Sequence, residues 1–201
     1  MAKSSSKPKG GRTASRNGNN AQKDAIALLK ADHREVEGWF EQFEKARSDD
    51  RKLELAQKIC TALNAHTVIE EEIFYPAFLE ATQETDIHHE AEVEHDGAKN
   101  LIAQIEASGP DDEYYDAKVT VLSEMIKHHV KEEEKRGGMF SKARGADMDL
   151  KSLGERLQAR KIEVMSELES SAGMPRPRPE VADQLLERGK EARREGARRP
   201  Q

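Results

Sequence analysis

Cysteine, aromatic residues and long apolar runs are all scarce in this sequence. The 201 residues include one cysteine, Cys60, so no intramolecular disulfide can form. Cys60 lies in an apolar helical pattern, and we interpret it as a small buried hydrophobe. Aromatic residues make up 4% of the chain and charged residues 36%, which favours amphipathic helices around one core. No apolar run approaches the roughly 20 residues of a bilayer-spanning helix, so we expect no membrane span.

Several catalytic sequence motifs are also missing. The chain contains no Gly-rich phosphate loop, no nucleotide-binding fingerprint and no nucleophile motif. Residues 1–20 contain no apolar segment of the kind found in secretory signals, and we therefore expect a cytoplasmic protein.

The net charge of −6 is distributed unevenly along the chain. Residues 1–20 carry +5 and residues 174–201 carry +3, which leaves −14 for residues 21–173. The ends are rich in Gly, Ser, Pro and Arg and lack the apolar residues that could offset the entropy cost of ordering. We predict disordered tails over 1–21 and 173–201. Basic tails could contact nucleic acid, but we interpret their charge as a source of solubility.

Four segments show the spacing of amphipathic helices, with short turn signals between them. Because the linkers are short, consecutive helices must fold back antiparallel. The pattern predicts an all-α fold, an up-down-up-down four-helix bundle over 22–145. Pro76 is expected to kink or tighten the second helix. The four segments run over about 22–46, over 51–81, from 86 to the SGPDD break at 108–112, and from 113 to the glycines at 137 and 138.

A further helix is predicted over 146–172. Its apolar residues follow helical spacing at Leu150, Leu153, Leu157 and Ile162. One apolar stripe needs one partner surface, so we expect this helix to pack across the outside of the bundle.

The apolar stripes of the four main helices contain polar residues that a simple core would not tolerate. Each stripe includes a histidine, and two stripes include a glutamate one turn later. A buried carboxylate without a partner is costly or takes up a proton, whereas a metal cation provides a partner for carboxylate and imidazole alike. Mixed imidazole and carboxylate ligands suit iron, and less decisively manganese or zinc. The stripes thus predict a metal site formed by His33, His66, Glu70, His95, His129 and Glu133.

Four segments of the chain resemble hemerythrin-like proteins of the HHE cation-binding family. They are LLKADHREVEGWF, HTVIEEEIFYP, EVEHDGAKNLI and HHVKEEEKRGGMF, and the resemblance covers about residues 22–145. It implies two non-haem iron ions joined by an oxo or hydroxo bridge inside the bundle. It also implies an open coordination position for a small molecule such as O2, H2O2 or NO, and it implies His33, His66, Glu70, His95 and His129 as ligands.

The sequence departs from the oxygen-carrying members of this family in two places. Those proteins have a second histidine on the third helix, at the position of Ala91. They also have an aspartate five residues after the fourth-helix histidine, where this chain has Glu134, while the helical stripe favours Glu133. Glu92 or solvent could fill the position left by Ala91. A less saturated iron suits peroxide, nitric oxide or redox chemistry better than reversible oxygen storage.

We expect the protein to bind or process small oxygen or nitrogen species in stress defence, and the pattern leaves open whether it is an enzyme. The alternative is a non-enzymatic sensor or storage protein for oxygen or iron. A ferritin-like centre would need two Glu-x-x-His pairs, and only Glu92 with His95 fits. We interpret the remaining histidines, His88, His89 and His128, as surface residues. Tyr75 and Tyr115 could lie close enough to the centre to donate a hydrogen bond or an electron, but a packing role is favoured for both.

Overall fold

The computed structural model describes residues 24–170, and all the regular structure in that range is helical. The tails predicted over 1–21 and 173–201 lie outside the described residues. No helix within 24–170 is both long enough and apolar enough to cross a bilayer. The elements are α1 (Ala25–Lys45), α2 (Asp49–Ile69), the π-helix η1 (Glu70–Phe74), α3 (Tyr75–Thr82), α4 (Thr85–Glu106), α5 (Tyr115–Glu134), α6 (Met139–Gly145) and α7 (Leu150–Ser170).

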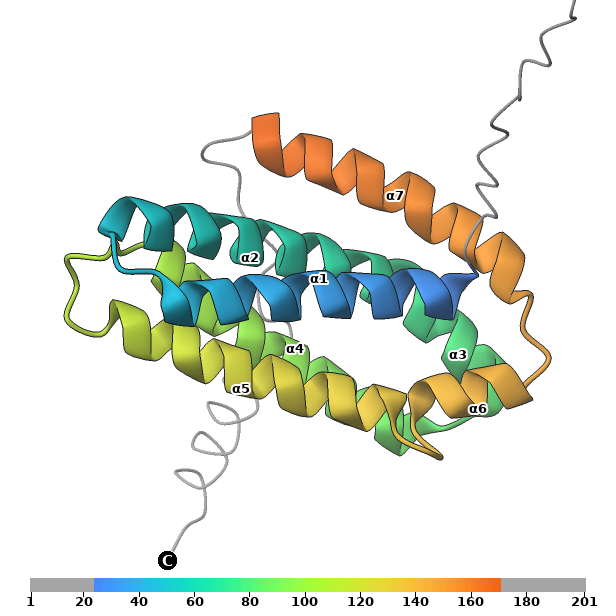
Figure 1. The fold of residues 1–201 in the computed structure, drawn as a ribbon. Helices are drawn as coiled ribbons and strands as arrows, with labels where there is room; N and C mark the ends of the chain where they lie inside the picture. Colours follow the sequence, from blue (N-terminus) through green and yellow to red (C-terminus); the bar gives the residue numbers. More distant parts are fainter. Residues whose placement is uncertain (1–23, 171–201) are drawn as a thin grey trace, which may run out of the picture.

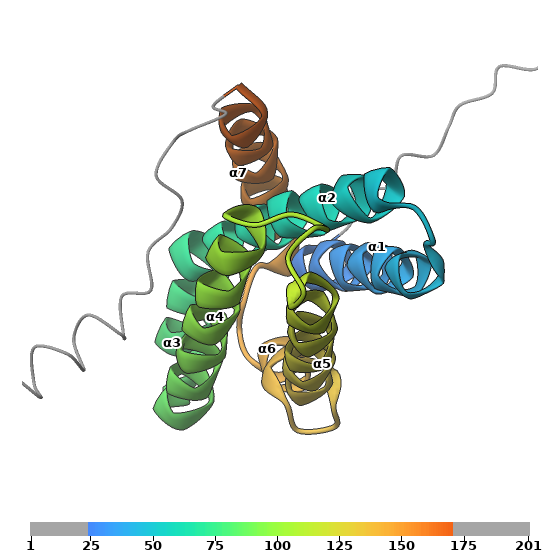
Figure 2. The ribbon, with the colours of Figure 1, turned by 90° about the vertical axis from the view of Figure 1, so that its left-hand side faces the viewer.

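Helices α1, α2, α4 and α5 form the predicted antiparallel bundle (Figure 1). They form a ring in which α1 contacts α2 and α5, while α4 contacts the same two helices from the other side (Figure 2). Asp24 starts α1 by accepting a hydrogen bond from the backbone N–H of Ala27 at 2.7 Å, and Ser48 caps α2 in the same way. The all-α, up-down-up-down prediction is confirmed.

The second bundle helix changes its winding at the three glutamates. Residues 70–74 form a π-helix, in which the N–H of Tyr75 donates to the carbonyl of Glu70 five residues earlier. Pro76 has no N–H to donate and would clash with a carbonyl four residues back, and the wider turn accommodates it. The helix therefore widens at Pro76, where the sequence predicted a kink or a tightening.

The interior consists of two apolar clusters with a polar layer between them. One cluster lies where α1 begins and includes side chains of η1, α3, α6 and α7. The other lies where α1 ends and α2 begins. The first includes Leu29, Phe74, Phe78, Phe140 and Leu157, and the second includes Phe40, Ile59, Ile102, Tyr115 and Leu122. The two clusters hold the helices firmly on both sides of the polar layer, and that layer is the candidate site.

Helix α7 packs on the outside of the bundle against α1, α2 and η1, as predicted (Figure 1). Its buried apolar side chains are those of Leu153, Leu157 and Val164. The prediction that Ile162 faces the bundle was wrong, because its side chain is 61% exposed. Ile162 follows Leu157 by five residues, which rotates it roughly 140° away from the buried stripe in an α-helix.

Gly138 connects α5 to α6 at a point where no side chain fits. A Cβ atom there would overlap the carbonyl oxygen of Glu132 and stand 2.9 Å from that of Glu133. We expect Gly138→Ala to lower the stability by roughly 2 kcal/mol and the melting temperature by roughly 4–8 °C, measured by calorimetry. Gly145→Ala is the matched control, since a Cβ at Gly145 meets no described atom within 4 Å. Equal melting temperatures for the two variants would contradict the close approach at Gly138.

Candidate metal centre

Four imidazoles converge in the polar layer, one from each bundle helix. His33 and His66 place their Nε2 atoms 3.1 Å apart, and His95 and His129 place theirs 3.3 Å apart. None of the four is more than 5% exposed. The structure therefore contains two imidazole pairs, one from α1 and α2 and the other from α4 and α5.

Two glutamates lie between these pairs. Oε2 of Glu70 is 3.2 Å from Nε2 of His66 and 3.4 Å from Nε2 of His95. Oε2 of Glu133 is 3.4 Å from Nε2 of His33 and 3.7 Å from Nε2 of His129. Each carboxylate thus reaches one histidine of each pair. The atoms of Glu70 also belong to two groups with metal-ligand spacing, one with His33 and His66 and one with His95 and His129.

Each imidazole has a carboxylate at its other ring nitrogen, Nδ1. The carboxylate comes from a neighbouring element each time, so the four pairs run around the bundle. The distances are 2.9 Å for His33 with Glu134, 3.5 Å for His66 with Asp32, 2.9 Å for His95 with Glu71 and 2.7 Å for His129 with Glu94. Carboxylates in this position orient imidazoles and increase their basicity as metal ligands.

The protein atoms alone leave this centre electrostatically unbalanced. A carboxylate only accepts hydrogen bonds, so it fixes the proton of a neutral imidazole on Nδ1 and leaves a lone pair on Nε2. Facing Nε2 atoms at 3.1 and 3.3 Å must therefore share a proton or bind a cation. In the described residues Oε1 of Glu70 and Oε2 of Glu133 are buried and also have no hydrogen-bond partner. Bound metal cations would provide partners for these atoms.

In the metal-free protein this crowding shifts the pKa values of the central groups. Burial lowers the pKa of His33 to about 4. Burial also opposes the charged form of His66, but the carboxylates of Glu70 and Asp32 outweigh it and raise the pKa to about 10. Burial and the negative charge of Glu70 raise the pKa of Glu133 to about 8. At neutral pH, therefore, His66 and Glu133 hold protons where metal ions would bind.

Loading the metal-free protein with Zn2+ at pH 7 is expected to release at least two protons per chain. His66 and Glu133 both have pKa values above 7, so a cation must displace their protons. The apparent affinity is then expected to fall as the pH is lowered. Titration calorimetry in buffers of different ionisation enthalpy measures the number of protons. Release of none would show that the two groups are unprotonated or do not bind the ion.

The hydroxyl of Tyr75 lies inside the centre, so the packing role predicted for this residue was incomplete. It is 3.4 Å from Oε2 of Glu70, 3.3 Å from Oε1 of Glu133 and 3.1 Å from Nε2 of His95. Burial and both carboxylates raise its pKa well above the usual value, so the phenol stays protonated and can donate. Glu70 and Tyr75 are five residues apart, and the π-helix between them places both on the inner face. Tyr115 lies in the second apolar cluster.

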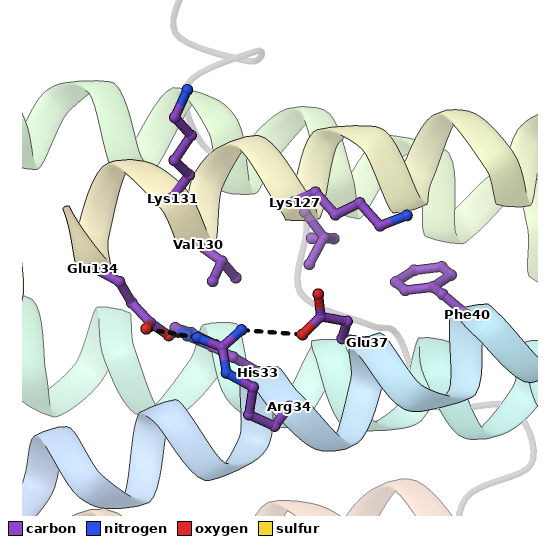
Figure 3. Close-up of a pocket in the computed structure, with 9 residues that line it drawn as sticks. His33, Arg34, Glu37, Phe40, Lys127, Val130, Lys131 and Glu134 are labelled. Atoms are coloured by element: carbon purple, nitrogen blue, oxygen red, sulfur yellow. Dashed lines mark hydrogen bonds and ion pairs between the residues drawn. The ribbon is translucent and has the colours of Figure 1, made fainter.

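The side chain of Glu134 lies outside the centre, where it lines a groove of about 220 Å³ between α1 and α5. It accepts hydrogen bonds from His33 and from Arg34, whose other guanidinium nitrogen pairs with Glu37 (Figure 3). Lys30 adds a third contact at 2.8 Å. Burial alone would raise the pKa of Glu134, but these partners outweigh burial and lower the pKa to about 2. Glu134 is placed to orient His33, whereas Glu133 is the residue that points at the centre.

A second pocket reaches the opposite imidazole pair beside Ala91. Its volume is about 180 Å³, and its lining includes His129 and Glu133 from the centre. The small side chain of Ala91 forms part of the wall, at the position where the oxygen-carrying hemerythrins have a histidine. Glu92, the other residue considered for that position, lies 40% exposed on α4 and pairs with His88 at 3.5 Å. The space left by Ala91 therefore opens toward the surface and is not filled by Glu92.

The structure brings the six predicted residues together and adds several that the sequence did not indicate. Asp32, Glu71 and Glu94 were missed as partners of the imidazoles. Each is next in sequence to one of the six, but each supports a histidine of a different helix. His89 and His128 are exposed as expected, whereas the side chain of His88 is only 14% exposed and its ring contacts Tyr75.

The outer carboxylates are themselves held by lysines. Lys161 of α7 is 2.7 Å from Asp32, and Lys99 of α4 is 2.7 Å from Glu71. Arg160 of α7 also pairs with Glu72 in the π-helix at 2.7 Å. Helix α7 thus contacts the elements that carry His33, His66 and Glu70, although it contributes none of the six central residues.

Comparison with known proteins agrees with this geometry. The family described as Hemerythrin HHE cation binding domain matches residues 24–137. No curated protein matches the chain. A crystal structure of a hemerythrin HHE cation binding domain-containing protein from Mycobacterium kansasii shares the fold, with 21% identity and a TM-score of 0.61. The similarity covers 72% of this chain and 89% of that one. Because the family match spans more than half of the sequence, the chain belongs to the hemerythrin HHE cation-binding domain family.

Proposed function

We propose that the polar layer holds two non-haem iron ions. His33 and His66 would bind one ion, His95 and His129 would bind the other, and Glu70 and Glu133 would reach both. The observation that carries this proposal is the convergence of four buried imidazoles, in two pairs with their Nε2 atoms 3.1 and 3.3 Å apart, on the two buried glutamates. Imidazole with carboxylate is a ligand set that suits iron, and the buried site excludes bulk water.

We further propose that a small uncharged molecule reaches this centre through the pocket at Ala91. The pocket has room for several molecules the size of water, at roughly 30 Å³ each. Besides Glu133 it is lined by Glu90, Glu94 and Glu132, with Lys135 as the one cation. This negative lining disfavours anions and accepts neutral molecules such as O2, H2O2 or NO.

Iron supplies the redox and Lewis-acid chemistry of such a centre, and the protein supplies proton control. Because the Tyr75 hydroxyl stays protonated, it can donate a hydrogen bond inside the centre. The carboxylates at the Nδ1 atoms hold each imidazole with its Nε2 toward the ions. With these groups the protein would bind or process oxygen or nitrogen species, in agreement with a role in stress defence.

The test is the metal content and ultraviolet-visible spectrum of freshly purified protein, together with the His66→Ala variant. The parent is expected to contain about two iron ions per chain and to show a bridged-iron absorption that responds to H2O2. His66→Ala removes one member of an imidazole pair and is expected to abolish this spectrum while circular dichroism remains helical. Full iron occupancy in the variant would contradict the ligand assignment, and zinc alone without a spectral response would contradict the iron.

A further inference from the structure

A third group of metal-ligating side chains lies on α4, outside the buried centre. We propose that His88, His89 and Glu92 bind a transition-metal cation at the protein surface. One ligand atom from each residue lies within 4.8 Å of the others. None of the three is among the six residues of the centre, so the protein would carry a cation site that does not depend on the di-iron proposal.

The spacing of these residues on the helix makes a common ion possible. Glu92 follows His88 by four residues and His89 by three, so it can reach both from one side of the helix. Nδ1 of His88 is 3.5 Å from Oε2 of Glu92. Two ligands of a tetrahedral Zn2+ ion with bonds of about 2.1 Å stand about 3.4 Å apart. The pair already has this separation, and the rings of His88 and His89 have their centroids 5.8 Å apart.

An ordinary hydrogen bond does not explain the position of His88. Its Nδ1 is buried, and in the part of the chain that the structure describes it has no hydrogen-bond partner. The distance of 3.5 Å to Glu92 is beyond the usual range for a nitrogen donor. The ring makes a T-shaped contact with the ring of Tyr75, which limits its freedom to turn toward solvent. A cation between His88 and Glu92 would satisfy the nitrogen where it lies.

The surrounding charge favours a cation as well. Residues 85–94 contain four acids, Asp86, Glu90, Glu92 and Glu94, and no lysine or arginine. His89 is exposed and the side chain of Glu92 is 40% exposed, so two of the three ligands face solvent. Two imidazoles and a carboxylate select borderline metals such as Zn2+, Fe2+ or Cu2+ over Mg2+ and Ca2+, which prefer oxygen ligands alone.

The experiment is a calorimetric titration of iron-loaded, tag-free full chain with ZnCl2. The parent is expected to bind one Zn2+ per chain beyond its iron. His89→Ala and Glu92→Gln are expected to weaken this binding at least ten-fold. His128→Ala is the matched control, because His128 is an exposed histidine that pairs with Glu94 at 3.2 Å, and it is expected to bind Zn2+ like the parent. Both test positions are exposed, so loss of folding is not expected and is checked by circular dichroism.

Unchanged Zn2+ affinity in His89→Ala and Glu92→Gln would overturn the proposal, as would the absence of any additional Zn2+ in the parent. The same titration is repeated in the His66→Ala background with and without His89→Ala. The difference between those two variants reports the surface site alone. Failure of the buried iron centre and failure of the α4 site would therefore give different results.

Discussion

Glu70→Gln is expected to reduce the iron content from about two ions per chain to a small fraction of one. Glu70 is fully buried, and its carboxylate reaches a histidine of each imidazole pair. It is also common to both groups of side chains that have metal-ligand spacing. The amide has the same shape but only one oxygen and no charge, so it cannot bind two cations as the carboxylate can. Replacing a single histidine, in contrast, removes a ligand from one ion only.

The measurement is iron per chain by elemental analysis after anaerobic loading, with thermal unfolding in parallel. Glu72→Gln is the matched control. It makes the same chemical change two residues away in the π-helix, but at a side chain that pairs with Arg160 on the surface. The control is expected to bind iron like the parent, and Glu70→Gln is expected to lose the stabilisation that iron provides. Normal iron content in Glu70→Gln would show that Glu70 does not hold the ions.

The sequence was sufficient to predict the bundle and the convergence of the six central residues. Both follow from helical periodicity, because His66 with Glu70 and His129 with Glu133 lie one turn apart on stripes that must face the core. Short linkers then force the stripes together. The same reasoning favoured Glu133 over Glu134, and the structure places Glu133 inward and Glu134 against Nδ1 of His33.

The partners at Nδ1 could not be predicted in the same way. Which carboxylate meets which imidazole depends on the rotation and axial offset of neighbouring helices, and neither is encoded in the period of one helix. A local signal did exist, because Asp32 and Glu94 directly precede His33 and His95, while Glu71 and Glu134 directly follow Glu70 and Glu133. An acid next to an inward residue points toward the adjacent helix, where it supports the imidazole of that helix.

Helical periodicity could not predict the π-helix either. Pro76 indicated a disturbance, but whether a helix kinks, tightens or widens depends on the side chains that must be accommodated. Here the wide turn places Glu70 and Tyr75 together on the inner face and leaves Glu71 and Glu72 to pair with Lys99 and Arg160. The same π-helix accommodates Pro76 and brings Glu70 and Tyr75 into the centre.

Ala91→Leu is expected to slow the reaction of the reduced iron centre with H2O2 or O2 at least ten-fold, which corresponds to about 1.4 kcal/mol in the activation barrier. The side chain of Ala91 lines the pocket that leads to His129 and Glu133, and three additional carbon atoms at that position would fill part of its volume of about 180 Å³. Leucine has nearly the helix propensity of alanine, so α4 is expected to remain intact. Iron content is expected to stay at the parent level, since Ala91 has no group that could bind a cation.

Stopped-flow absorption of the reduced protein after mixing with the oxidant measures this rate. Val93→Leu is the matched control, because Val93 lies two residues further along α4 with its side chain 56% exposed and outside the pocket. An unchanged rate in Ala91→Leu would point instead to the groove between α1 and α5, which is lined by His33, Val130 and Phe40 (Figure 3). A slower rate only in Ala91→Leu would mean that small molecules reach the metal ions through the pocket beside Ala91, where the oxygen-carrying hemerythrins have a histidine.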